Sequence, residues 1–245
     1  MENHRSRLAA LSNQVRHLLD NCALFAQPCL LCAGDGGPDG ICAACRADLA
    51  TLPAAHCPIC ADAGPTGLPC PHCRRRRPAF DTLNAPFVYA WPLSALIHAF
   101  KYGHRLDMAH ALRALFARHA PEGPARPDLV VPVPLFAARL AERGFNQSLE
   151  LARAFAVRMA APLDDTLCVR VRNTPPQARL ERAARTRNVA DVFVVERAVT
   201  GLSVAIVDDV ATSGATLDAL AAALKKQGAR RVDAWVLARV FYSKT

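Results

Sequence analysis

Residues 204–217, with the sequence VAIVDDVATSGATL, constrain the fold of this chain more than any other segment. A short run rich in Val and Ile is followed by two carboxylates, a turn of small and hydroxyl-bearing residues, and then apolar residues at helical spacing. This order predicts a buried strand that ends at Asp208, a loop, and a helix that begins directly afterwards. A strand, loop and helix in immediate succession indicate an α/β protein.

The loop after this strand has the residue types that surround a bound phosphate. Gly214 allows the backbone to approach an anion closely, and hydroxyls and N–H groups at a helix start bind it. Asp208 and Asp209 would repel the phosphate itself, so their expected partners are the hydroxyls of an attached sugar or a hydrated divalent cation. The competing interpretation is a buried strand followed by an acidic surface turn. No G-x-G-x-x-G follows a strand and no G-x-x-x-x-G-K-[ST] is present, which argues against a dinucleotide site or a P-loop.

Eight of the ten cysteines form four C-x-x-C pairs. The last two pairs repeat the first two at a constant offset, equal to that from Cys29 to Cys57, which indicates an internal duplication. Each half has two pairs separated by a spacer that includes Gly and Pro, the arrangement of a four-cysteine zinc ribbon. We predict two structural zinc ions held by Cys29, Cys32, Cys42, Cys45, Cys57, Cys60, Cys70 and Cys73.

The spacing alone leaves the pairing of these cysteines open. Either each repeat holds its own ion, or the first and third pairs share one ion in a cross-brace. A disulfide framework or a redox C-x-x-C is the other interpretation, and the absence of a secretory segment argues against it. We expect Cys22 and Cys168 to be small buried hydrophobic residues rather than ligands.

Length and composition predict a chain in three parts. The 245 residues are 52% hydrophobic, enough for one large core beside a small module that needs metal to fold. No apolar run approaches the roughly 20 residues of a membrane span. Apolar residues at helical spacing are interleaved with charges over 1–28, so this segment does not resemble a signal peptide. We predict a cytoplasmic protein with an amphipathic helix over 1–28, a double zinc ribbon over 29–77 and an α/β domain over 78–245.

Four consecutive arginines, Arg74, Arg75, Arg76 and Arg77, follow the last C-x-x-C pair in a chain of formal net charge +9. Such a run is either a nucleic-acid clamp or a solvated junction between two parts of the chain. The sequence leaves both interpretations open.

Strands and helices alternate along the rest of the chain. Strands are predicted over 128–133, 167–171, 193–195, 204–208 and 231–240, and helices over 93–102 and 108–119, through 149–155 and up to residue 227. The stretch between the first strand and the third helix is predicted to be a loop that carries Arg139 and Arg143. The strand-helix-strand spacing predicts a parallel sheet with helices on both faces and a ligand at the carboxyl ends of its strands.

The motifs of the chain resemble, in their order, those of the ComF family. They are VPVP at 131–134, Arg139, RGFNQ at 143–147, Gln177, RNV at 187–189, Phe193, and DDVATSGATL at 208–217. The family likewise begins with a cysteine-rich zinc ribbon region, so the resemblance extends from about Cys29 to Val240. Ser213 stands where Thr is commoner and keeps the hydroxyl. The family is regarded as phosphoribosyltransferase-like and is linked to natural competence, the uptake of single-stranded DNA, or the use of DNA as a nutrient.

This resemblance implies a type I phosphoribosyltransferase-like fold that binds phosphoribosyl pyrophosphate (PRPP) with Mg²⁺. Asp208 and Asp209 would bind the ribose hydroxyls, residues 211–216 the 5′-phosphate, and the loop with Arg139 and Arg143 the pyrophosphate. The arginine-rich stretch 173–188 would be a mobile lid. The implied catalytic residues are Asp208, Asp209, Arg143 and Arg187. The implied PRPP-binding residues are Asp208, Asp209, Ala211, Thr212, Ser213, Gly214, Ala215, Thr216, Arg139 and Lys101.

Two functions of different class follow from these features. In the first, the protein is an enzyme that transfers phosphoribose to an acceptor which the sequence does not identify. In the second, it is a non-catalytic adaptor that binds single-stranded DNA and passes it to competence or recombination proteins, and its PRPP pocket is a sensor or a relic. No general base and no acceptor pocket can be identified in the sequence, so both functions stay open.

Overall fold

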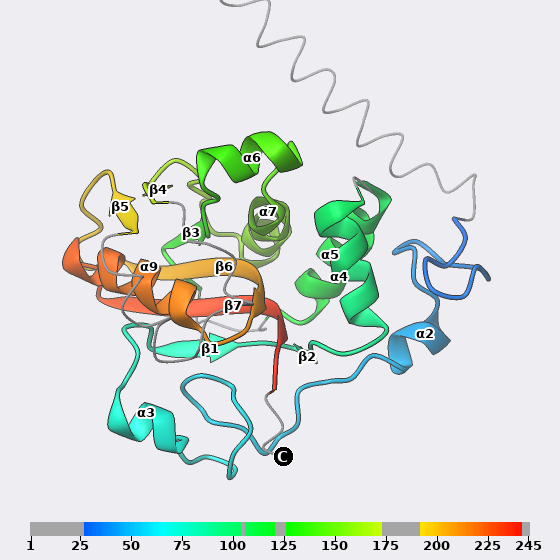
Figure 1. Ribbon diagram of the computed structural model, residues 1–245, viewed down its shortest axis with the longest axis horizontal. Coiled ribbons are helices and arrows are strands. Elements are labelled where there is room, and N and C mark those ends of the chain that lie inside the picture. Colours follow the sequence, from blue (N-terminus) through cyan, green and yellow to red (C-terminus); the bar gives the residue numbers. More distant parts are fainter. Residues whose placement is uncertain (1–26, 104–105, 121–125, 173–191, 242–245) are drawn as a thin grey trace, which may run out of the picture. The chain divides into compact units, whose positions relative to one another are not determined.

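The computed structural model describes residues 27–103, 106–120, 126–172 and 192–241 (Figure 1). The chain divides into two compact units, the first ending at Arg46 and the second beginning at Ala47. In the first unit an isolated bridge pairs Pro28 with Asp35. Helix α2 (Ala43–Ala47) begins directly after Cys42 and contains Cys45, the second cysteine of that C-x-x-C pair. None of the helices within the described ranges has the length and apolar character needed to cross a membrane.

A parallel sheet forms the centre of the second unit. Its strands lie in the order β1 (Thr82–Asn84), β7 (Arg231–Arg239), β6 (Ser203–Ala211) and β3 (Leu129–Pro132). Strand β2 (Phe87–Val88) pairs with β7 further along the edge that β1 occupies. Every pairing in this sheet is parallel, which confirms the predicted sheet. Strands β1 and β2 were not predicted from the sequence, because such short segments show too little hydrophobic periodicity.

Helix α9 (Ala215–Lys226) covers one face of the sheet (Figure 1). Its apolar side, with Leu217 and Leu220, lies in the same buried cluster as Ile206 of β6 and Val232 of β7. Because both faces of the sheet are covered, the central strands are near-continuous apolar runs rather than alternating ones.

Helices α7 (Gln147–Met159) and α5 (Leu106–Arg118) lie on the opposite face. Phe155 of α7 contacts Trp235 of β7, with ring centroids 5.1 Å apart, and on its other side Phe116 of α5, at 5.6 Å. The predicted arrangement of helices on both faces is therefore confirmed.

The segment between β3 and α7 differs from the predicted loop, because α6 (Ala137–Arg143) occupies half of it. Alanine, leucine and glutamate favour a helix here, and Gly144, with a φ of 77°, ends it in the left-handed conformation that glycine adopts readily. Asn146 then caps α7 by accepting a hydrogen bond from the Ser148 N–H at 3.0 Å. Arg139 and Arg143 thus lie on a helix. Helix α4 (Leu93–Tyr102) precedes α5 in the chain.

Strands β4 (Cys168–Arg170) and β5 (Phe193–Val195) form an antiparallel pair of their own. Both strands were predicted from the sequence, but neither joins the parallel sheet. Leu167, Phe193 and Val195 are buried in the cluster that α9 covers, so the pair packs beside that helix. Cys168 is also buried there, as expected for a hydrophobic residue.

The second four-cysteine segment belongs to the second unit. Its cysteines share one buried cluster with Phe80, Leu83 and residues of the sheet and α9. The predicted boundaries after residues 28 and 77 stay predictions, and most of the predicted N-terminal helix lies outside the described residues.

Candidate functional site

Two groups of four cysteines are brought together, each from two consecutive C-x-x-C pairs. The first group is Cys29, Cys32, Cys42 and Cys45, and the second is Cys57, Cys60, Cys70 and Cys73. The four sulfur atoms of each group all lie within 4.8 Å of one another. Each group thus combines two C-x-x-C pairs that are consecutive in the sequence, and not the first pair with the third, as a cross-brace would require.

Both groups repeat the same backbone geometry. The N–H of the third cysteine donates to the sulfur of the first, at 3.4 Å in the first group and 3.3 Å in the second. The residue after the first pair, Ala33 or Ala61, has a positive φ in both, of 60° and 53°. Equivalent positions in the two groups are related by the same offset as the sequence repeat.

The sulfur spacing fits a zinc ion in each group. Thiolates about 2.3 Å from a tetrahedral Zn²⁺ lie about 3.8 Å from one another. The sulfurs of Cys32 and Cys42 are 3.8 Å apart and those of Cys60 and Cys70 are 3.7 Å apart, far beyond a disulfide bond of about 2 Å. All nine cysteines among the described residues are free thiols. Each group could therefore hold one metal ion.

Backbone donors favour the thiolate of Cys57 in the second group. Burial raises the pKa of the Cys57 thiol, but N–H groups, that of Cys70 foremost, point at its sulfur and lower its pKa to about 7. A thiolate stabilised in this way is the form that binds metal.

Asp208 and Asp209 lie near the carboxyl end of β6, which runs on to Ala211 rather than ending at Asp208 as predicted. The Asp209 carboxylate is 2.6 Å from the Lys101 ammonium at the end of α4, and the side chain of Asp209 is 5% exposed. The Ser148 hydroxyl at the start of α7 donates to Asp208 at 2.7 Å. Three elements far apart in the sequence thus converge on the predicted pair.

The two carboxylates carry more negative charge than their neighbour Lys101 can balance. Burial and the adjacent Asp209 raise the pKa of Asp208 to about 7, against the opposing effects of Ser148 and Lys101. Burial disfavours the charged form of Lys101, but Asp209 and then Asp208 more than offset this and raise its pKa. A cation or a pair of hydroxyl donors at Asp208 would relieve the imbalance, so these residues fit a sugar or a divalent ion.

Arginines of two elements, β4 and α6, interact with this pair or with its neighbours. Burial lowers the pKa of Arg170 on β4. The negative charge of Asp208 acts to raise this pKa, and the positive charge of Arg139 on α6 acts to lower it, so the three charges interact. Arg143, at the end of α6, donates to Gln147 and lies over the Tyr102 ring at 5.3 Å from its centroid. Of these arginines, Arg170, which was not predicted, interacts with Asp208 itself, whereas Arg143 contacts the residues that precede Ser148 and follow Lys101.

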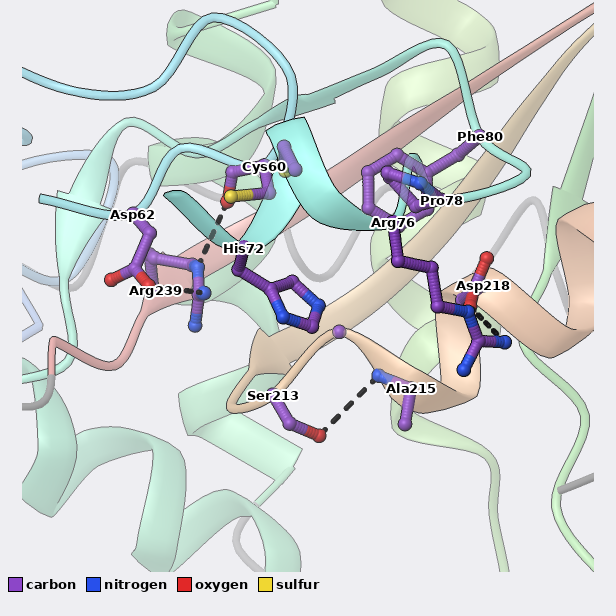
Figure 2. Close-up of a pocket in the computed structure, with 12 residues that line it drawn as sticks. Cys60, Asp62, His72, Arg76, Pro78, Phe80, Ser213, Ala215, Asp218 and Arg239 are labelled. Carbon is purple, nitrogen blue, oxygen red and sulfur yellow. Dashed lines mark hydrogen bonds and ion pairs between the residues drawn. The ribbon is translucent and has the colours of Figure 1, made fainter. Parts of the chain in front are cut away.

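The predicted phosphate loop connects β6 to α9. Gly214 has a φ of 80° and directly precedes the helix, and the Ser213 hydroxyl accepts from the Ala215 N–H at 3.4 Å (Figure 2). The left-handed conformation explains the need for glycine there. Ala211 ends the strand and Thr216 lies in the first helical turn, so the turn itself is shorter than the predicted segment.

Arg239, at the end of β7, links this loop to the second cysteine group. Its side chain is buried and donates to the Cys60 carbonyl at 3.1 Å and to the Ala211 carbonyl at 3.1 Å. It also donates to the Thr212 carbonyl. The guanidinium lies 3.8 Å from the Asp62 carboxylate (Figure 2). The loop and the cysteine group are thus fastened to one guanidinium.

Sequence reasoning missed Ser148, Arg170 and Arg239. A charged residue at the end of the apolar run 231–240 is the one signal that could have identified Arg239. Arg187 and the rest of the predicted lid, residues 173–188, lie outside the described residues.

Comparison with known proteins agrees with this geometry. Residues 106–241 match the phosphoribosyl transferase domain. The DNA utilization protein YhgH of Salmonella typhi is 37% identical over 207 residues, which cover 82% of this chain and 90% of the relative. Competence protein F of Haemophilus influenzae is 28% identical over 86% of this chain and 96% of its own length, and competence protein ComFC of Bacillus subtilis is 25% identical over 81% and 84%.

The chain belongs to the ComF family of phosphoribosyltransferase-like proteins. The predicted resemblance is therefore confirmed, and so is the fold that it implied. The two four-cysteine groups of this ComF protein precede the part that matches the transferase domain.

Purified without chelator, this ComF protein is expected to contain two zinc ions, and Cys57→Ser with Cys60→Ser is expected to remove one. Because the second group shares the core of the second unit, the variant should also lower the melting temperature of that unit. The matched variant, Cys29→Ser with Cys32→Ser, should lose one zinc without this loss. Elemental analysis and calorimetry measure both effects, and fewer than one zinc in the parent protein would contradict the assignment.

Asp208→Asn is expected to stabilise the unliganded ComF protein increasingly as pH rises. The pKa of Asp208, about 7 when folded, lies above the value of about 4 in the unfolded chain, so its deprotonation costs stability between these pH values. The difference in melting temperature between variant and parent should grow from pH 4 to pH 8. Asp165→Asn, at an exposed position, is the control substitution. A pH-independent difference for Asp208→Asn would contradict the raised pKa of Asp208.

Proposed function

We propose that this protein is a phosphoribosyltransferase that binds PRPP with Mg²⁺ and acts in the use or uptake of DNA. One observation carries the proposal. The carboxylates of Asp208 and Asp209 lie near the end of β6, the pKa of Asp208 is raised, and Arg170 is close enough to interact with it. The loop that follows them turns at Gly214 into the start of α9, where N–H groups can bind an anion. Membership of the phosphoribosyl transferase domain family supports the PRPP assignment, and the names of the relatives support the link to DNA.

The roles of the residues follow from the charge that each part of PRPP carries. Asp208 and Asp209 accept hydrogen bonds from the ribose hydroxyls, which lowers the free-energy cost of ionising Asp208. Residues 211–216 hold the 5′-phosphate through N–H groups and hydroxyls at the start of α9. Arg139 and Arg143, with Arg170, neutralise the pyrophosphate.

In the transfer step the acceptor nucleophile forms a bond to C1 of the ribose. The bond from C1 to the pyrophosphate oxygen breaks, and its electron pair leaves with pyrophosphate. Positive charge develops on the sugar and negative charge on the leaving group, so the carboxylates and the arginines stabilise opposite ends of the same transition state. Bound Mg²⁺ supplies further neutralisation of the pyrophosphate. Arg187 is assigned to the same work by resemblance to the family.

The two cysteine groups are assigned two structural zinc ions. Four thiolates and no open position are typical of structural sites, whereas catalytic zinc keeps a water ligand. The protein is expected to work in the cytoplasm, with competence or recombination proteins as partners.

Titration calorimetry with PRPP and Mg²⁺ tests the proposed site. Asp208→Asn combined with Asp209→Asn should weaken PRPP binding at least about tenfold, because hydrogen bonds to charged groups are lost. Inorganic phosphate, which the loop alone holds, should bind both forms alike. Asp165→Asn serves as the exposed control. Equal PRPP affinity in the parent and the double variant would refute the carboxylate assignment, and a pyrophosphate-release assay with candidate acceptors then tests catalysis.

The second candidate function is a non-catalytic adaptor for single-stranded DNA. Arg74, Arg75, Arg76 and Arg77 are all exposed, and the run begins in α3 (Pro71–Arg75), in the same unit as the PRPP site. One of them, Arg76, lies 3.8 Å from Asp218 at the start of α9, next to the phosphate loop. A basic run so placed would bind the DNA backbone beside the PRPP site.

Salt dependence separates the adaptor from an enzyme with a small-molecule acceptor. Replacing Arg74, Arg75 and Arg77 by Gln should flatten the plot of log affinity for single-stranded DNA against log salt by about 2, since each lost contact contributes about 0.7. The control replaces three other exposed arginines, Arg118, Arg126 and Arg158. A parent protein that binds no single-stranded DNA at low salt, with or without PRPP, leaves the adaptor without support.

A further inference from the structure

Arg239 lies where the second cysteine group, the sheet and the phosphate loop meet. Its side chain is 3% exposed, although arginine is among the residues least often buried. The guanidinium donates to carbonyls of Cys60, Ala211, Thr212 and Val240. A buried cation with this many bonds is costly to leave without its partners, so the segments that carry those carbonyls are tied to one another.

The bonds of Arg239 also determine which way the loop presents its N–H groups. A planar trans peptide points its carbonyl and its N–H in opposite directions. The carbonyls of Ala211 and Thr212 are held toward Arg239, so the N–H groups of Thr212 and Ser213 are turned away from that cation. Those two N–H groups belong to the loop assigned to the 5′-phosphate.

The other end of the same cysteine segment contacts the helix that follows the loop. The Ala79 N–H donates to Asp218 at 2.6 Å, in the first turn of α9. The Phe80 ring lies 3.9 Å from where a Cβ on Gly214 would be (Figure 2). The segment from Cys60 to Phe80 therefore holds the phosphate loop at both of its ends.

We propose that Arg239 is a positioning residue which couples metal binding in the second cysteine group to the shape of the phosphate loop. Metal fixes the knuckle that contains Cys60, and with it the carbonyl that anchors Arg239. The anchored guanidinium orients the peptides at 211–213. The first cysteine group, in the other unit, has no part in this coupling. The affinity measurements that test this inference rest on the proposed binding of PRPP, whereas the hydrogen-exchange measurements depend only on the loop.

Two substitutions of Arg239 test the coupling. Arg239→Lys keeps a charge but cannot reach several carbonyls with a planar fork, and Arg239→Met keeps only the volume. Both should weaken PRPP and inorganic phosphate binding, Met more than Lys and by about tenfold or more. Arg231→Lys, on the exposed start of the same strand, is the matched control and should bind as the parent does. Parent-like affinity in a folded Arg239→Met variant, measured well below its melting temperature, overturns the proposal.

A double-mutant cycle then asks whether the metal acts through Arg239. Cys57→Ser with Cys60→Ser should weaken phosphate binding by a similar factor, and adding Arg239→Met should cause no further loss, because both changes break one linkage. Cys29→Ser with Cys32→Ser should leave the affinity unchanged. Losses that simply add would show that the cysteines and Arg239 act separately.

Amide hydrogen exchange keeps the inference separate from the proposed function. Removing metal from the second group, by chelation of the Cys29→Ser, Cys32→Ser variant that holds metal only there, should raise exchange at residues 212–216 and not at the β3–β6 pairing. If the parent protein binds neither PRPP nor phosphate, the proposed function fails while this measurement still tests the coupling. Unchanged exchange in the loop on loss of that metal overturns it.

Discussion

The parallel pairing of β6 with β7 is the constraint on which the rest of the second unit depends. It runs from Ser203 opposite Arg231 to Ala211 opposite Arg239, and so brings the carboxylates of β6 and the guanidinium of β7 to the carboxyl end of the sheet. The carboxylates of β6 lie at this end beside Lys101, and the guanidinium of β7 lies beside the loop that follows. A shift of one residue in this register would turn the side chains of the shifted strand to the wrong face, and the carboxylates and the guanidinium would no longer lie as they do.

The charges at this end of the sheet differ in how far they are satisfied within the protein. Arg239 is bonded to carbonyls on several sides and does structural work without a ligand. Asp208 is different. The Ser148 hydroxyl and Lys101, which it shares with Asp209, lower its pKa too little to offset burial and the charge of Asp209, so its pKa stays raised. A residue that its own protein stabilises incompletely is a good candidate for binding something else, because the ligand then recovers free energy that folding left unused. Arg239 therefore has a structural role in the site, whereas Asp208 is a candidate for contact with the substrate.

Much of this could be predicted from the sequence, for identifiable physical reasons. The strand before Asp208, the turn at Gly214 and the helix after it are encoded in one short continuous segment, and local patterns of this kind are the ones that sequence reports well. The cysteines were equally explicit because metal binding fixes their spacing. Arg239 and Ser148 were missed since their importance comes from partners far away along the chain, which no local pattern reveals. The helix at 137–143 was missed because an arginine-rich family motif was taken for a loop, although its alanines favour helix.

The two repeats have the same ligands and the same bonds, but they differ in their surroundings. All four sulfurs of the second group belong to buried residues, whereas Cys32 is exposed and Cys42 and Cys45 are partly exposed. A metal ion exchanges by letting a competing ligand approach one thiolate at a time, and only the first group offers such an approach without opening the core. Two chemically alike ions would therefore leave the same molecule on different timescales: one at a rate set by access from solvent, the other at a rate set by how often the core of the second unit opens.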